Sequence, residues 1–135
     1  MDNGQLYQTI KVVVMKENIL RDKSYAFALR IVKAYKFLSQ EQREFVLSKQ
    51  LLRSGTSIGA MVRESEHAQS TADFVNKLSV ALKEANETEY WLMLLKDTGY
   101  INKEVFMSIV EDCKELLRLL ISSIKTAKQR RTNET

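Results

Sequence analysis

The chain of 135 residues contains no proline, four glycines, one cysteine and one histidine. It therefore has few of the turn residues that loop-rich β folds and proline-rich linkers require. The single cysteine excludes an intramolecular disulfide and is typical of a reducing compartment. No apolar run reaches the roughly 18 residues that span a membrane, and the first residues lack the layout of a signal peptide. We expect a cytoplasmic protein with no membrane partner.

Hydrophobic residues make up 44% of the chain and charged residues 28%, which is typical of one folded domain with a sizeable core. The net charge of +4 is unevenly distributed. Residues 1–63 carry 11 basic and 5 acidic side chains, residues 64–115 carry 5 and 11, and residues 116–135 carry 5 and 1. Such segregation favours an anionic partner or complementary self-association, although solvated helix faces explain it equally simply.

Apolar residues recur at helical spacing in four segments. The first segment extends from about residue 22 to residue 38, with Asp22 as its N-cap. Its predicted apolar stripe is Tyr25, Ala28, Leu29, Val32 and Tyr35, widened by Phe27, Ile31 and Leu38. The second segment follows a capping pattern at Ser39 and Gln42, and its core arc is Leu51, Leu52, Gly55, Ile58, Gly59 and Val62. Two glycines in a helix indicate a close approach of another helix, because each costs about 1 kcal/mol relative to alanine.

The third segment begins after Ser70, which has Asp73 three residues later, and Gly99 is its predicted stop. Its coiled-coil-like seam is Phe74, Leu78, Ala81, Ala85, Thr88, Leu92 and Leu95. The fourth segment starts near Asn102, with the core stripe Val105, Ile109, Cys113, Leu116, Leu120, Ile124 and Ala127.

Four long helices with short connections predict an all-α fold, an antiparallel up-down-up-down four-helix bundle over residues 22–128. Residues 1–21 are predicted to be an N-terminal arm of uncertain structure, and Met15 is an alternative start of the protein. Residues 129–135 are predicted to be a frayed, basic polar tail.

The motifs of catalysis are weak or absent. Glu64 and His67 have the Glu-x-x-His spacing of di-iron bundles, and Glu84 and Glu87 are further carboxylates. Such a centre requires a second histidine, which the chain lacks, so we interpret the motif as a polar helix end and predict neither a metal nor a cofactor. Cys113 is predicted to be a buried structural thiol. With no phosphate-binding loop, dinucleotide fingerprint or hydrolase elbow, we predict no enzymatic activity.

A second stripe on the third helix combines large apolar groups with two carboxylates. It either contacts two neighbouring helices of the same bundle or forms a subunit interface in which Glu84 or Glu87 pairs with a basic residue. The predicted oligomer interface consists of Gly55, Gly59, Val80, Glu84, Glu87, Tyr90, Trp91 and Leu94.

Basic residues also form stripes at helical spacing. Such stripes are more often solvated faces than phosphate-binding surfaces, but three of them in one small chain favour binding to nucleic acid. One on the first helix contains Lys23, Arg30 and Lys33. The candidate nucleic-acid-binding residues are Lys49, Arg53, Arg63, Lys114, Arg118, Lys125 and Lys128.

Three stretches, residues 23–32 (KSYAFALRIV), 50–60 (QLLRSGTSIGA) and 77–92 (KLSVALKEANETEYWL), resemble one bacterial family. It is the family of four-helix-bundle proteins encoded in intervening sequences of 23S ribosomal RNA genes, and the resemblance covers roughly residues 16–128. The accessory variability proteins of diversity-generating retroelements are distant relatives that bind nucleic acid and a reverse transcriptase. The resemblance implies an all-α bundle that assembles as a ring-like homopentamer and has no known enzymatic activity.

Two functional hypotheses follow. In the first, a non-catalytic homo-oligomer, presumed pentameric from the resemblance, binds RNA, DNA or a nucleoprotein through its basic stripes. In the alternative, a structural or adaptor oligomer recruits a protein partner and binds no nucleic acid.

Overall fold

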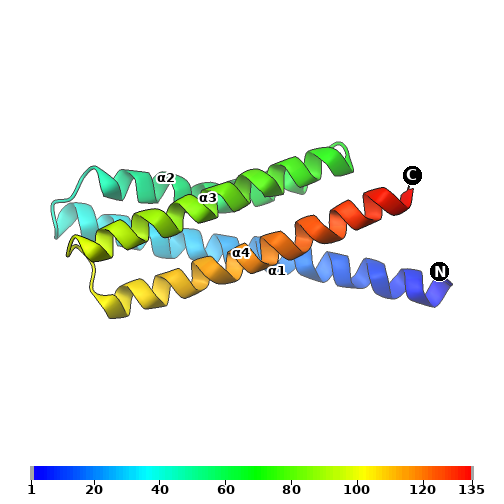
Figure 1. The fold of residues 1–135 in the computed structure, drawn as a ribbon, viewed down its shortest axis with the longest axis horizontal. Helices are drawn as coiled ribbons and strands as arrows, with labels where there is room; N and C mark the ends of the chain where they lie inside the picture. The colour runs from blue at the N-terminus through cyan, green and yellow to red at the C-terminus, as the bar shows by residue number, and fades with distance from the viewer. Residues whose placement is uncertain (1, 135) are drawn as a thin grey trace.

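The computed structural model describes residues 2–134 and contains four long helices. They are α1 (Asn3–Gln40), α2 (Leu47–Ser65), α3 (Thr71–Asp97) and α4 (Lys103–Glu134). The chain reverses direction at each of the three turns (Figure 1). Helix α1 packs against α2 and α4, and α3 packs against the same two helices. The predicted four-helix bundle is confirmed. Over the described residues, no helix has an apolar stretch of the length and hydropathy that would cross a bilayer.

The core lies along the seams of α2, α3 and α4 that the sequence predicts. The six seam residues of α3 from Leu78 to Leu95 are all buried. The α4 stripe is buried from Ile109 to Ala127, and only its first member, Val105, is exposed. On α2, the predicted arc contains the buried residues Leu51, Gly55, Ile58 and Val62. The helical period of the apolar residues was sufficient to predict these seams.

Helix α1 buries only part of the predicted face. Its buried residues are Leu20, Ser24, Phe27, Ile31 and Leu38. Phe27, Ile31 and Leu38 of the predicted face are buried as expected. Tyr25 is 54% exposed and Leu29 48% exposed, so the assignment of these two residues to the core is wrong. Because this stretch is apolar on several sides, a 3.6-residue period fits more than one face. Contact with α2 and α4 selects the face that is buried.

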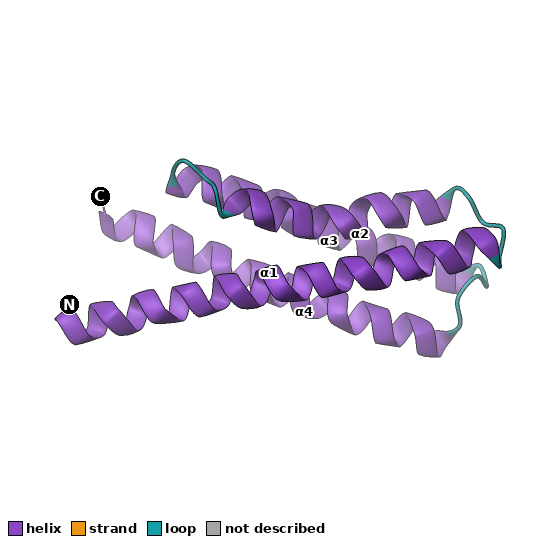
Figure 2. Ribbon diagram, turned by 180° about the vertical axis from the view of Figure 1, so that it is seen from behind, coloured by secondary structure: helices purple, strands orange, loops and turns teal. Residues whose placement is uncertain are grey.

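Both ends of the chain are more helical than predicted. Asp2 caps α1, because its carboxylate accepts a hydrogen bond from the Gln5 amide at 2.7 Å and the Gln5 side chain accepts one from the Asp2 amide at 2.9 Å. Asp22 therefore lies inside α1, and residues 3–21 are helix rather than an arm. Residues 129–134 continue α4, so the predicted frayed tail is wrong there; residue 135 lies outside the described residues. Helices α1 and α4 both extend past the α2–α3 turn (Figure 2).

The α1–α2 turn uses Glu44 instead of the predicted capping box. Ser39 belongs to the last turn of α1, where its hydroxyl donates to the Tyr35 carbonyl at 2.8 Å. The buried Glu44 carboxylate accepts hydrogen bonds from the amides of Val46, Leu47 and Ser48 at 2.6–3.0 Å. Burial by itself raises the pKa of Glu44, but the amides of Leu47, Ser48 and Val46 stabilise the charged form and the net pKa is lowered. Glu44 thus satisfies the free amides at the start of α2.

The other helix ends agree with the sequence. The Ser70 hydroxyl accepts a hydrogen bond from the Asp73 amide at 3.0 Å, as predicted for the start of α3. Gly99 follows the end of α3 with a φ of 85°, a left-handed conformation that favours glycine. Asn102 accepts a hydrogen bond from the Val105 amide at 2.8 Å and starts α4.

The two glycines of α2 lie against α1 in the same chain. A Cβ atom on Gly55 would be 2.7 Å from Cγ1 of Ile31, and one on Gly59 would be 3.3 Å from the Ser24 carbonyl oxygen. The predicted close approach of a helix is therefore present, but its partner is α1. Gly55 is buried there and leaves no surface for a second copy, so its assignment to the oligomer interface is wrong.

We predict that Gly55→Ala destabilises the protein. The new methyl collides with the buried Ile31, and overpacking of this kind costs about 1–3 kcal/mol, which outweighs the gain in helix propensity of about 1 kcal/mol. Urea denaturation followed by circular dichroism measures the loss. In an Ile31→Ala background the collision is removed, and Gly55→Ala should become stabilising. Destabilisation of the same size in both backgrounds would contradict the prediction.

Candidate nucleic-acid interface

One face of α4 carries four unpaired cations. Lys114, Arg118, Lys125 and Lys128 fall within an arc of about 80° and span about 21 Å of helix. All four are exposed, and none forms an ion pair with another described residue. A row of free cations on a rigid helix can contact successive phosphates of a nucleic-acid backbone.

The predicted stripe on α2 is not a comparable surface. Lys49 is exposed, and the Arg63 guanidinium lies 5.7 Å from the ring centre of Tyr25 on α1. Arg53 instead pairs with two carboxylates of its own chain, so it is not a free cation.

On α1, two of the three stripe residues also pair internally. Lys23 forms an ion pair with Glu115, and Arg30 pairs with Asp112 at 2.7 Å and donates to the Ser108 carbonyl at 3.1 Å. These contacts join α1 to α4 across the surface of the bundle. Lys33 is the exposed member without an ion pair in the described chain.

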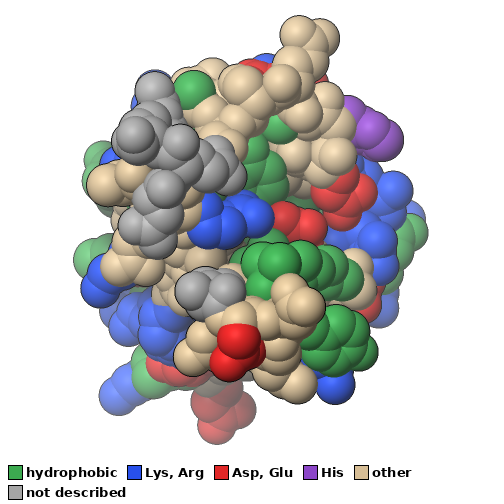
Figure 3. Space-filling model, turned by 90° about the vertical axis from the view of Figure 1, so that its right-hand side faces the viewer, with side chains coloured by type: hydrophobic (Ala, Val, Ile, Leu, Met, Phe, Trp, Pro, Cys, Tyr) green, Lys and Arg blue, Asp and Glu red, His purple; other side chains and the backbone are tan. Residues whose placement is uncertain are grey.

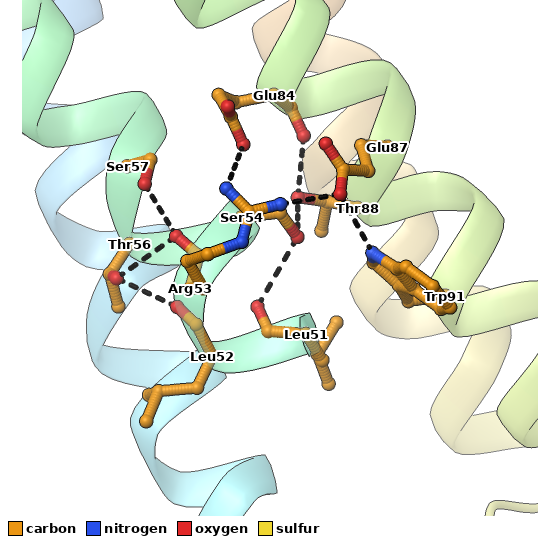
Figure 4. A network of polar contacts seen from close by, with 10 residues as sticks. All are labelled: Leu51, Leu52, Arg53, Ser54, Thr56, Ser57, Glu84, Glu87, Thr88 and Trp91. Carbon is orange, nitrogen blue, oxygen red and sulfur yellow. Dashed lines mark hydrogen bonds and ion pairs between the residues drawn. The ribbon is translucent and has the colours of Figure 1, made fainter. Parts of the chain in front are cut away.

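Arg53 is the centre of a polar network between α2 and α3 (Figure 4). Its guanidinium donates to Glu84 at 3.1 Å and to Glu87, and the Trp91 indole N–H donates to the same Glu87 oxygen at 3.3 Å. The hydrogen bond to Glu87 and the charges of both carboxylates raise the pKa of Arg53 above its usual value. Beneath this network, the buried hydroxyls of Ser54 and Thr88 lie 2.9 Å apart.

The network settles how the second stripe of α3 is used. The Glu84 side chain is only 14% exposed, and Glu84 and Glu87 find their basic partner within the chain, so the idea that one of them pairs with another subunit is wrong. Val80, Trp91 and Leu94 are half-buried. Tyr90 alone of the predicted interface set is fully on the surface, with 55% of its area exposed, and its ring packs edge-on against Trp91.

Glu64 and His67 lie at the exposed end of α2 and the turn that follows. Glu84 pairs with Arg53, and Arg53 lies eleven residues before Glu64 on α2. Along the helix axis, Arg53 and Glu64 are therefore about 16 Å apart, so Glu84 does not lie beside the Glu64 and His67 motif. Within residues 2–134, no three His, Cys, Asp or Glu side chains are placed to hold one metal ion together.

Cys113 is buried in the core, where its thiol donates to the Ala85 carbonyl at 3.3 Å. Burial raises the pKa of the Cys113 thiol to about 12. The thiol is therefore protonated at neutral pH and is a weak nucleophile.

A groove that was not predicted from the sequence lies between α3 and the last turns of α4. This groove, which we call the α3–α4 groove, has a volume of about 710 Å³ and is lined by Leu82, Ile121, Ile124, Lys125, Lys128, Gln129 and Thr132. Ile121 is 54% exposed and lies among the cations of the α4 face. An isoleucine off the core stripe, between Arg118 and Lys125, was the one sequence feature that pointed to it.

Comparison with known proteins identifies a family and a similar solved structure. The family model of the 23S rRNA-intervening sequence proteins matches residues 16–122. A crystal structure of a protein of unknown function from the S23 ribosomal protein family of Bacteroides thetaiotaomicron is 64% identical to this chain, with a TM-score of 0.81. The match covers 82% of this chain and 98% of that one. No curated protein matches the chain.

We predict that Cys113 does not react with a thiol reagent in the folded protein. Burial and the raised pKa both keep the thiolate population negligible at pH 8. A colorimetric disulfide reagent should label less than a tenth of the chains in buffer and all of them in denaturant. Rapid labelling of the folded protein would show that the α3–α4 core is open to solvent.

Proposed function

The chain belongs to the family of 23S rRNA-intervening sequence proteins, and on that premise we propose that it is a non-catalytic homo-oligomer that binds nucleic acid through α4. The observation that carries the proposal is the row of Lys114, Arg118, Lys125 and Lys128, which are exposed and have no acidic partner among the described residues. Elsewhere on the bundle, Lys23, Arg30 and Arg53 are neutralised by carboxylates of the same chain. The α4 face therefore retains positive potential.

Self-association strengthens this surface. Repeating a weak phosphate-binding row around a ring multiplies its effect, because linked sites act at a high effective concentration. The family resemblance implies a pentamer, whose mass would be about 78 kDa for a chain of 15.6 kDa. Outward-facing Tyr25 and Leu29 on α1 and Tyr90 on α3 offer apolar area for contacts between copies.

We expect the untagged protein to bind labelled duplex RNA or duplex DNA, with an affinity that falls steeply as salt rises. Each phosphate contact releases counterions, so four contacts per chain give a slope of about −3 to −4 in a plot of log affinity against log salt. Fluorescence anisotropy across a salt series measures the slope. The double variant Arg118→Glu, Lys125→Glu should weaken binding at least tenfold.

Lys33→Glu with Lys103→Glu is the matched control, because both residues are exposed, lie outside the α4 row and form no ion pair in the described chain. This control has the same net charge as the double variant. Equal losses of affinity in the two double variants would mean that binding depends on net charge and not on the α4 row. No binding at low salt would overturn the proposal.

We expect light scattering to give a mass of about 78 kDa that Tyr90→Glu lowers. A charge on this exposed ring opposes its burial between copies, while the fold loses little because the ring already faces solvent. Met107→Glu, on an exposed side chain of α4, controls for the added charge. A monomeric mass for the unmodified protein would contradict self-association, and an unchanged mass for Tyr90→Glu would place the interface elsewhere.

A further inference from the structure

We propose that the α3–α4 groove is a docking site for an acidic amphipathic helix of a partner protein. The proposal rests on the apolar floor of the groove and the unpaired lysines on its rim. It goes beyond the proposed function, because it assigns a second kind of ligand to the C-terminal half of α4.

The floor of the groove is apolar. It is formed by Leu82 of α3 and by Ile121 and Ile124 of α4. Leu82 is half-buried and Ile121 is more than half exposed, whereas Ile124 is 9% exposed and belongs to the core. A partner that covered Ile121 and Leu82 would extend the bundle core outward, which is the energetic reason for apolar docking.

The rim of the groove is basic. Lys125 and Lys128 line it one turn apart, and neither has an ion-pair partner in the part of the chain that the structure describes. None of the described residues that line the groove is acidic. At the end of the molecule that carries both termini, basic and apolar side chains lie next to one another on the surface (Figure 3). Charge complementarity therefore calls for carboxylates beside the apolar side chains of the occupant.

A helix fits the shape of this groove. Along α4, the lining residues follow one another at intervals of four, three and four residues: Ile121, Lys125, Lys128 and Thr132. Such intervals form a ridge that packs into the groove between rows of side chains on a second helix. The floor needs apolar anchors at i, i+3 or i+4 and i+7, and the lysines need glutamates or aspartates on the flanks of that row.

A nucleic acid fits the floor less well than a protein does. Phosphates and sugars would pair with Lys125 and Lys128 but would leave Ile121 and Leu82 without an apolar partner. The row of Lys114 and Arg118, which lies outside the groove, has no such apolar floor. Because Lys125 and Lys128 serve both surfaces, we expect helix and nucleic acid to compete for this end of α4.

The test uses the full-length protein and three labelled synthetic helices in fluorescence anisotropy. The first peptide has leucines at i, i+4, i+7 and i+11 with glutamates beside them. The second replaces those glutamates by lysines, and the third keeps the glutamates but replaces the leucines by serines. We expect saturable binding of the first peptide with a Kd below about 1 mM and at least tenfold weaker binding of the other two.

Variants place the binding site. Ile121→Ser and the double variant Lys125→Glu, Lys128→Glu should each weaken the first peptide at least fivefold. Met107→Ser is the matched control for the first, because it removes an exposed apolar side chain from the same helix outside the groove. Lys33→Glu with Lys103→Glu is the control for the second. Circular dichroism confirms that all the variants are folded.

The outcomes separate this inference from the proposed function. Ile121→Ser should weaken binding of the first peptide and leave binding of duplex RNA unchanged. The double variant Lys114→Glu, Arg118→Glu should weaken binding of RNA far more than binding of the peptide. Equal binding of the first and third peptides, or no effect of Ile121→Ser, would leave only a polyanion surface and overturn the inference. No binding of the first peptide at about 1 mM would overturn it as well. Methyl signals of Ile121 that shift on dilution of the protein alone would assign the groove to a second copy and also overturn it.

Discussion

The close contact of α2 with α1 at Gly55 fixes the geometry on which the rest of the bundle depends. With no side chain at this position, α2 approaches Ile31 so closely that a methyl group would collide with it. Helix α2 is thereby held with Arg53 toward α3, where the guanidinium bridges Glu84 and Glu87. The two carboxylates sit on successive turns of α3, so one arginine joins two turns of α3 to α2. The Arg53 side chain is 49% exposed, so solvent screens these ion pairs and they add little to the free energy of unfolding.

Pairing within the chain decides which cations remain available. The sequence shows three basic stripes of similar appearance, but carboxylates on α3 and α4 pair with Lys23, Arg30 and Arg53 of two of them. The α4 stripe is the one in which no member has an ion pair among the described residues. A stripe pattern reports which residues share a helix face, and it contains no information about the helix that packs beside that face. On α4 itself, Glu115 and Asp112 pair with Lys23 and Arg30 of α1 and not with the cations of the α4 row.

The parts of the fold that the sequence predicted were those with one strong local pattern. The α3 seam, the Ser70 cap and the Gly99 stop depend on spacing and local hydrogen bonds, which the sequence contains in full. On α1, Tyr25 and Leu29 were assigned to the core together with Phe27 and Ile31, because all four fit a helical period and only tertiary contact distinguishes the two pairs. The cap by Glu44 was also not predicted. The α3–α4 groove was not predicted because residues of two helices form it, and no single segment of the sequence encodes it.

The ends of α1 and α4 extend beyond the α2–α3 turn, so the molecule changes there from four helices to two. Beyond that turn neither α2 nor α3 lies beside them, and local opening of these ends does not require the whole bundle to unfold. Lys16 of α1 donates a hydrogen bond to Ser122 of α4 at 3.2 Å. The α3–α4 groove is lined by residues of α4 as far as Thr132, which is close to the end of that helix. A ligand that binds in the groove would therefore order the last turns of α4, and the conformational entropy lost in that ordering would lower its affinity. Through that entropy, the order of a helix end becomes part of the binding free energy.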